Sequence, residues 1–185
     1  MRASLRLAAL ALAANTGLAQ AQSSTLMTDI MKDLKSLEGK VMGLARAMPD
    51  ASWSWRPGPG VRSVGEVYQH IATDNYLLPA MLGTPAPAAT GIKGDDYKTA
   101  QAYETRKADR AAIVADLEAS FAFLRKAMEA QSGATLGSEI TVFGRKTTAQ
   151  ETWLLTITHL HEHLGQAIAY ARSNNVTPPW SKSGS

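Results

Sequence analysis

Apolar side chains recur along this chain at alternating spacings of three and four residues, the repeat of a helix that buries one face. The segments with this pattern span residues 25–48, 63–82, roughly 98–131, and 148–172. In the first segment the apolar positions are Leu26, Ile30, Leu34, Leu37, Val41, Leu44 and Met48. The pattern predicts four amphipathic helices, and no internal repeat is present.

Residues that begin and end helices flank these segments. Two of the segments start with the spacing of a capping box, Ser63 with Glu66 and Thr148 with Glu151. Asn174 and Asn175 are typical of a left-handed C-cap. Residues 138–146 are too short and too glycine-flanked for a helix and indicate an extended arm or a small hairpin. We therefore predict an all-α fold, a four-helix bundle with long irregular connections.

The first 21 residues have the three parts of a secretory signal peptide. Arg2 and Arg6 form a basic region, a short apolar run follows, and Ala-Gln-Ala at 19–21 is a small-residue cleavage signal. We therefore expect residues 1–21 to be a signal peptide and residues 22–185 to form one exported domain, periplasmic or secreted.

Composition narrows the classes of partner and cofactor. Formal net charge is +3, and removal of the two arginines of the leader lowers it to +1. No Lys/Arg-rich stripe with interleaved aromatic residues is present, so nucleic acid is not expected as a partner. The chain contains no cysteine, which leaves His, Asp, Glu and water as metal ligands. No apolar run reaches the roughly 20 residues of a membrane span. Pairing through an exposed helix seam would give a homodimer, which the sequence leaves open.

Three histidines form the most informative pattern in the chain. His159 and His163 are four residues apart in the last predicted helix, so their imidazoles lie one turn apart on the same side. A helix presents two nitrogen ligands to one divalent metal in this way. His70 stands at a similar edge position on the second predicted helix. Three protein ligands leave coordination positions for water or substrate, which favours catalysis over a structural metal. The alternative is that these histidines only pack.

Neighbouring polar residues have more than one interpretation. Asp74, one turn after His70, is a fourth ligand, an acceptor that orients an imidazole, or a solvated helix carboxylate. Asp74 and Glu162 are the nearest candidates for a general base, and no residue stands out in that role. His161 projects to another face of its helix, so we do not expect it in the site. Gly165 occupies the place where an H-E-x-x-H motif needs its second histidine, so a zincin protease mechanism is unsupported.

Several motifs together resemble one known family, the DinB-like superfamily of four-helix-bundle metalloenzymes. The paired histidines followed by Gly-Gln are the most specific of them, and their order and spacing cover nearly the whole mature chain. The matching pieces are Trp55-Arg56-Pro57, Ser63-Val64-Gly65-Glu66 with His70, His159-x3-His163-Leu164-Gly165-Gln166, and Pro178-Pro179-Trp180.

The resemblance implies that His70, His159 and His163 form a three-histidine site for a divalent ion such as zinc, nickel or iron. Family members with assigned activities include thiol-dependent transferases and isomerases. The residue after the second paired histidine is often Arg in the family. Here it is Leu164, so the anion contact that an Arg would make is not expected.

We therefore predict an exported divalent-metal-binding protein that acts as a metal-dependent hydrolase or transferase on a small molecule. The ion would lower the pKa of a bound water or polarise a substrate atom. The alternative function is a non-catalytic module that binds a metal or small ligand for sensing, storage or delivery. A pocket over the metal with room for a substrate would favour the enzyme.

Overall fold

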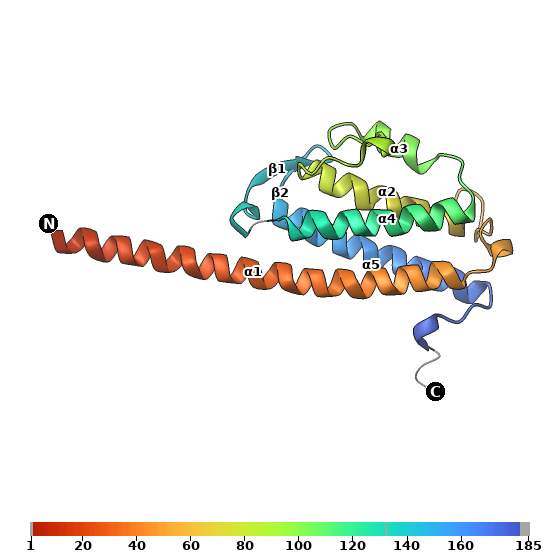
Figure 1. Cartoon of the computed structure of the whole chain (residues 1–185), viewed down its shortest axis with the longest axis horizontal. Helices are drawn as coiled ribbons and strands as arrows, with labels where there is room; N and C mark the ends of the chain where they lie inside the picture. Colours follow the sequence, from red (N-terminus) through yellow and green to blue (C-terminus); the bar gives the residue numbers. More distant parts are fainter. Residues whose placement is uncertain (1, 132, 182–185) are drawn as a thin grey trace.

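A computed structural model describes the backbone of residues 2–131 and 133–181 and the side chains from residue 25 onward within those ranges. In the described part of the chain, five helices and one hairpin follow one another, with short 3-10 turns in the connections (Figure 1). Their bounds are α1 Arg2–Ala47, α2 Val64–Met81, α3 Tyr97–Glu104, α4 Arg110–Glu129, β1 Glu139–Val142, β2 Arg145–Thr148 and α5 Ala149–Ser173. The predicted helical class is therefore confirmed, with a small two-stranded sheet added.

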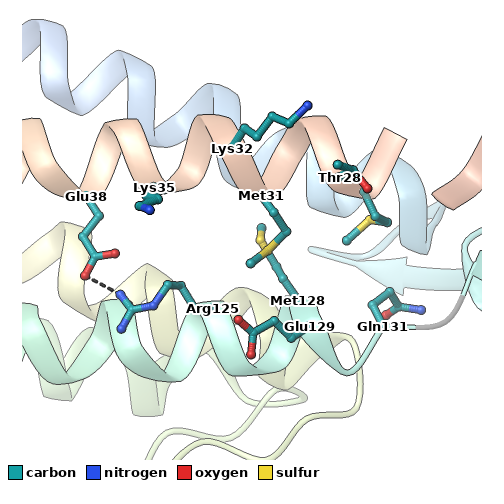
Figure 2. Close-up of a pocket in the computed structure, with 10 residues that line it drawn as sticks. Thr28, Met31, Lys32, Lys35, Glu38, Arg125, Met128, Glu129 and Gln131 are labelled. Carbon is teal, nitrogen blue, oxygen red and sulfur yellow. Dashed lines mark hydrogen bonds and ion pairs between the residues drawn. The ribbon is translucent and has the colours of Figure 1, made fainter. Parts of the chain in front are cut away.

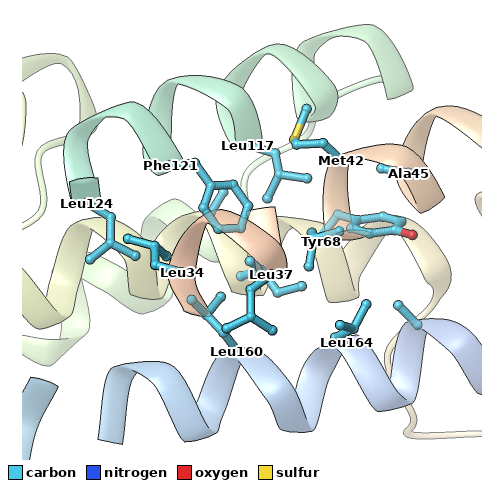
Figure 3. Close-up of a cluster of buried hydrophobic side chains, with 14 of the residues drawn as sticks. Leu34, Leu37, Met42, Ala45, Tyr68, Leu117, Phe121, Leu124, Leu160 and Leu164 are labelled. Carbon is cyan, nitrogen blue, oxygen red and sulfur yellow. The ribbon is translucent and has the colours of Figure 1, made fainter. Parts of the chain in front are cut away.

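The four long helices α1, α2, α4 and α5 pack against one another around a shared apolar core (Figure 3). The periodic positions of the first predicted helix point into it: Leu34, Val41 and Leu44 are fully buried, and Leu26 packs at its edge. Residues from α4 and α5, such as Phe121 and Leu160, complete the contact. The helical repeat in the sequence thus identified the core-facing side correctly.

Helix α1 is longer than its partners and projects past them at its N-terminal end (Figure 1). Its side chains in the core, among those described, begin at Met27. Within the described residues no helix combines the length and apolar character needed to cross a bilayer. The predicted cleavage point after residue 21 lies before the first of these core positions.

The third predicted helix, residues 98–131, is wrong as a single element. The chain forms two helices, α3 and α4, separated by residues 105–109. Asp109 is the physical reason, because its side chain accepts a hydrogen bond from the backbone N–H of Ala112 and begins a new helix there. The Thr105 hydroxyl donates to the carbonyl oxygen of Gln101 at the end of α3. Short α3 lies beside α2 instead of continuing along the core.

The first predicted helix, residues 25–48, starts too late, because α1 runs from Arg2 to Ala47 and its first half is rich in alanine and leucine, which are strong helix formers. The other boundaries agree closely with the sequence. The capping box of Ser63 and Glu66 is present at the start of α2. Residues 138–146 contain the predicted hairpin, with Val142 opposite Arg145. At the start of α5, Thr148 accepts from the backbone N–H of Glu151, but the Glu151 carboxylate accepts from the Thr147 hydroxyl. The second capping box is therefore only half formed.

Candidate metal centre

The packing of α2 against α5 brings the three predicted histidines together. His70 comes from the middle of α2, and His159 and His163 come from consecutive turns of α5. The Nε2 atom of His159 lies 3.2 Å from Nε2 of His70 and 2.9 Å from Nε2 of His163. Each histidine thus presents Nε2 to one common point, and the three form a cluster of the size that holds a metal ion.

These separations match the coordination of one ion. Metal–nitrogen bonds of about 2.0–2.1 Å place two imidazole nitrogens about 2.9 Å apart at right angles and about 3.4 Å apart in a tetrahedron. The two separations around His159 lie at or close to this interval. Imidazole is also a ligand that suits zinc, nickel and iron. The residues present therefore fit a divalent metal with three histidine ligands.

Acceptors on the far side of two rings set the tautomer that such a site needs. Nδ1 of His70 lies 3.1 Å from Oε2 of Glu104, and Nδ1 of His163 lies 2.8 Å from Oε1 of Gln166. A carboxylate or amide oxygen accepts an N–H, and Oε2 of Glu104 is nearer to Nδ1 of His70 than is Nη2 of Arg62, which lies at 3.3 Å. These contacts therefore favour the proton of each ring on Nδ1. The lone pair of Nε2 is then directed at the common point, the arrangement typical of metal-bound histidines.

The two acceptors are themselves held by a network that crosses three segments. The Gln166 amide donates to the hydroxyl of Tyr170 over 3.1 Å, and that hydroxyl donates to the backbone carbonyl of Arg62 over 3.1 Å. The Arg62 guanidinium in turn donates to Glu104 at 2.9 Å. The loop before α2, the end of α3 and helix α5 are thereby tied to the same pair of imidazoles.

Electrostatics around the cluster favour neutral imidazoles. Burial, together with the neighbouring histidines, lowers the pKa of His159 from 6.5 to about 3. Burial also lowers the pKa of His163, and this outweighs the hydrogen bond to Gln166. Burial raises the pKa of Glu104, but hydrogen bonds and charges from His70 and Arg62 more than offset it and hold the pKa below its usual value. Neutral imidazoles at His159 and His163 are the protonation states that metal binding requires of these two ligands.

Asp74 and Glu162 lie in different surroundings. Oδ2 of Asp74 is 3.2 Å from Nε2 of His159 and 3.4 Å from Nε2 of His70, so its carboxylate faces the metal side of both rings. Burial raises the pKa of Asp74 to about 6. Glu162 is exposed on α5, outside the three-histidine cluster. Of the two acidic candidates, only Asp74 lies within contact distance of ligand nitrogens.

His161 points away from the cluster, as its position on the helix predicts. Its Nε2 lies 2.8 Å from the carboxylate of Asp33 on α1, and its side chain is half exposed. The predicted helical register of α5 is therefore correct: His159 and His163 share one face, and His161 lies on another.

The cluster lies at the edge of the core, with one-fifth of the His159 side chain and one-tenth of the His70 side chain exposed. The largest cavity described, about 770 Å³, is elsewhere, between α1 and α4 (Figure 2). Met31, Arg125 and Met128 are among its lining residues. None of the five cavities described is lined by a histidine of the cluster.

Sequence reasoning missed Glu104 and Arg62. Glu104 falls within what reads as one continuous amphipathic helix, where a carboxylate has no special meaning. Its role depends on the break after α3, which turns its side chain toward His70. Arg62 contacts Glu104 from 42 positions away. The cap at Asp109 is the one local signal that could have indicated a break, because aspartate is a preferred N-cap residue.

Comparison with known proteins gives one family and several related folds. The sequence profile of the DinB superfamily matches residues 34–167. A DinB-like protein from Bacillus cereus has a similar structure, with a TM-score of 0.66 and 18% identity over 81% of this chain and 93% of that one. A DinB-like protein from Bacillus subtilis has a TM-score of 0.61 and 20% identity, and the match covers 80% of this chain and 93% of that one. A conserved protein from Enterococcus faecalis has a TM-score of 0.56 and 19% identity, over 83% of this chain and 95% of that one. No curated protein matches this chain.

Two groups at the cluster predict opposite pH dependences for the stability of metal-free protein. Folding lowers the pKa of His159, so below about pH 6.5 the unfolded chain binds a proton at this residue that the folded chain does not bind. The free energy of unfolding therefore decreases as the pH is lowered. The pKa of Asp74 is raised by folding, so between about pH 6 and pH 4 the folded chain binds the proton first, and stability rises as pH falls. The two effects offset each other in the wild-type chain.

Single variants should separate them. Relative to wild type, we expect Asp74→Asn to lose up to about 1.4 kcal/mol of unfolding free energy per pH unit between about pH 6 and pH 4. His159→Gln should gain stability relative to wild type over the same interval. Urea denaturation of chelator-treated protein at several pH values measures both. Parallel profiles for the two variants and wild type would contradict the opposed shifts.

Proposed function

This chain belongs to the DinB superfamily, and on that premise we propose that His70, His159 and His163 hold one divalent metal ion at which a small molecule is hydrolysed or transferred. The observation that carries the proposal is the convergence of three Nε2 atoms within bonding distance of a single point. Zinc, nickel and iron all suit three imidazole ligands. The likeness to solved structures supports the fold alone.

The chemistry of this site divides between the ion and the chain. A bound divalent ion supplies Lewis acidity, which lowers the pKa of a coordinated water or polarises a substrate oxygen or sulfur. Glu104 and Gln166 hold the rings of His70 and His163 so that Nε2 faces inward. Asp74 is placed to be a fourth ligand or to take a proton at Oδ2, because that atom faces the same nitrogens.

Export is part of the same proposal. Residues 1–21 have the signal-peptide pattern, and the described core positions of α1 begin after them, at Met27. Cleavage after Ala21 would leave those core positions in the mature chain. A site without cysteine also suits an oxidising compartment, where a thiolate ligand is open to oxidation. N-terminal sequencing of the protein recovered from a secretion-competent host tests the cleavage point.

Metal retention by four single variants tests the ligand set. His70→Ala, His159→Ala and His163→Ala should each lose the metal on dialysis, because two imidazoles make a poor site. His161→Ala is the matched control, from the same helix and with its ring on another face, and should keep it. Metal per chain is measured on protein purified without an affinity tag. A wild-type chain that neither contains nor takes up a divalent metal would refute the proposal.

Two glutamates provide a second matched pair. Glu104→Gln weakens the acceptor for the Nδ1 proton of His70, and loss of such partners typically lowers metal affinity about 10–100-fold. Glu162→Gln removes the same charge at an exposed position of α5 outside the cluster, and its affinity should stay near wild type. Competition with a chelator of known affinity measures both. Equal affinities for the two variants would show that Glu104 does not support the site.

A non-catalytic binding module is the second candidate, and one observation favours it: the described cavities do not include the histidines. Turnover separates the two. The metal-loaded chain should hydrolyse an activated ester such as p-nitrophenyl acetate or transfer a thiol to an activated acceptor, and His159→Ala should not. Full metal loading without metal-dependent turnover of either kind would favour the binding module.

A further inference from the structure

Two exposed apolar side chains line one cavity between the hairpin and α5. In the part of the chain whose side chains are described, five large apolar residues are strongly exposed: Val61, Tyr97, Phe143, Leu154 and Leu155. Two of them are in contact: the ring centroids of Tyr97 on α3 and Phe143 in the hairpin lie 5.8 Å apart, with an interplanar angle of 86°. Phe143 and Leu155 line a common cavity of about 550 Å³ between the hairpin and α5.

Phe143 occupies a backbone position that does not favour it. It forms the two-residue hairpin turn with Gly144, and both residues have positive φ, 50° and 75°. Such turns favour Asn-Gly, Asp-Gly or Gly-Gly, and a bulky residue at positive φ is an outlier. Half of the Phe143 side chain is exposed, so core packing does not account for it. A bulky residue kept at a strained turn points to a role for its side chain.

The cavity contains no histidine of the cluster, but one of its lining residues lies a helical turn from the cluster on α5. Leu155 is four residues before His159, which is about 6 Å along the helix on the same side. Tyr97 does not line the cavity, but its ring contacts Phe143, and it begins the helix α3 that ends at Glu104. Burial raises the pKa of the Tyr97 hydroxyl, and the carboxylates of Asp74 and Glu104 raise it further, so the hydroxyl lies within their field.

The lining also carries one cation without an acidic partner. Lys146 is paired with Glu139 at 2.8 Å, whereas Arg145 forms no ion pair with any described residue. The lining thus combines apolar side chains such as Phe143 and Leu155 with the unpaired cation of Arg145. It also includes one carboxylate, that of Glu151, which accepts from the Thr147 hydroxyl. The volume, about 550 Å³, is within the range of small-molecule sites, about 300–1,000 Å³.

We propose that this cavity is the substrate-binding site of the protein and that it takes a small anion with an aromatic or branched apolar body. The body lies against Phe143 and Leu155, the negative group is met by Arg145, and the reacting group extends along α5 to the histidines. This inference rests on the proposed function, since the histidines are its reactive end.

Anilinonaphthalene sulfonate is a suitable probe, because it is an aromatic anion whose fluorescence rises on leaving water. We expect Phe143→Asn and Leu155→Ser each to weaken its binding to the full metal-loaded chain about tenfold. Leu154→Ser is the matched control, because Leu154 is equally exposed on the same helix but does not line the cavity. Its affinity should equal wild type. Phe143→Asn should also keep or raise the thermal midpoint, since the turn favours asparagine.

Two results would overturn this assignment. One is wild-type probe affinity in both Phe143→Asn and Leu155→Ser, or an equal loss in Leu154→Ser. The other is the absence of paramagnetic broadening of the probe's aromatic proton signals in cobalt-loaded protein compared with zinc-loaded protein, which would separate the cavity from the histidines. Failure of the metal proposal is distinguishable, because the chain would then take up no metal while probe affinity still responded to Phe143 and Leu155.

Discussion

The contact between α2 and α5 is the interaction on which the candidate site depends. It places His70 of α2 against the imidazoles of His159 and His163 of α5, so the cluster needs both helices. The two helices can hold this register because they share one apolar core with α1 and α4. Burial beside that core lowers the pKa values of His159 and His163 and so favours their neutral, metal-binding form. The packing of α2 against α5 therefore both positions the histidines and buries them.

The break between α3 and α4 connects the fold to the chemistry. An uninterrupted helix over residues 98–131 would run along the core, whereas the short α3 lies beside α2. Glu104 at its end then accepts hydrogen bonds from His70 and Arg62. The backbone carbonyl of Arg62 accepts from Tyr170, which accepts from Gln166, the partner of His163. Tyr97 at its start reaches the exposed hairpin turn. The short helix α3 thus carries one residue that supports a histidine of the cluster and one that contacts the hairpin turn.

The sequence predicted what depends on local periodicity. The helical repeats, the cap at Ser63, the hairpin and the divergent faces of His159 and His161 all follow from spacing along one element, and the structure agrees. The motifs also identified the family correctly. The break at Asp109 was missed because the large apolar positions of that predicted helix, from Val114 to Met128, all lie after it and no Gly or Pro marks the break. Glu104 and Arg62 were missed because their roles arise from contacts between distant segments, which periodicity does not encode.

X-ray absorption of the bound metal shows whether three imidazoles hold the ion. On the full chain, purified without a tag and loaded with zinc, we expect nearest neighbours at about 2.0–2.1 Å with the multiple-scattering pattern of three imidazoles. His161→Ala should give the same spectrum, because its ring contacts Asp33. A spectrum without imidazole scattering, or with fewer than three imidazoles, would show that the three Nε2 atoms do not bind one ion.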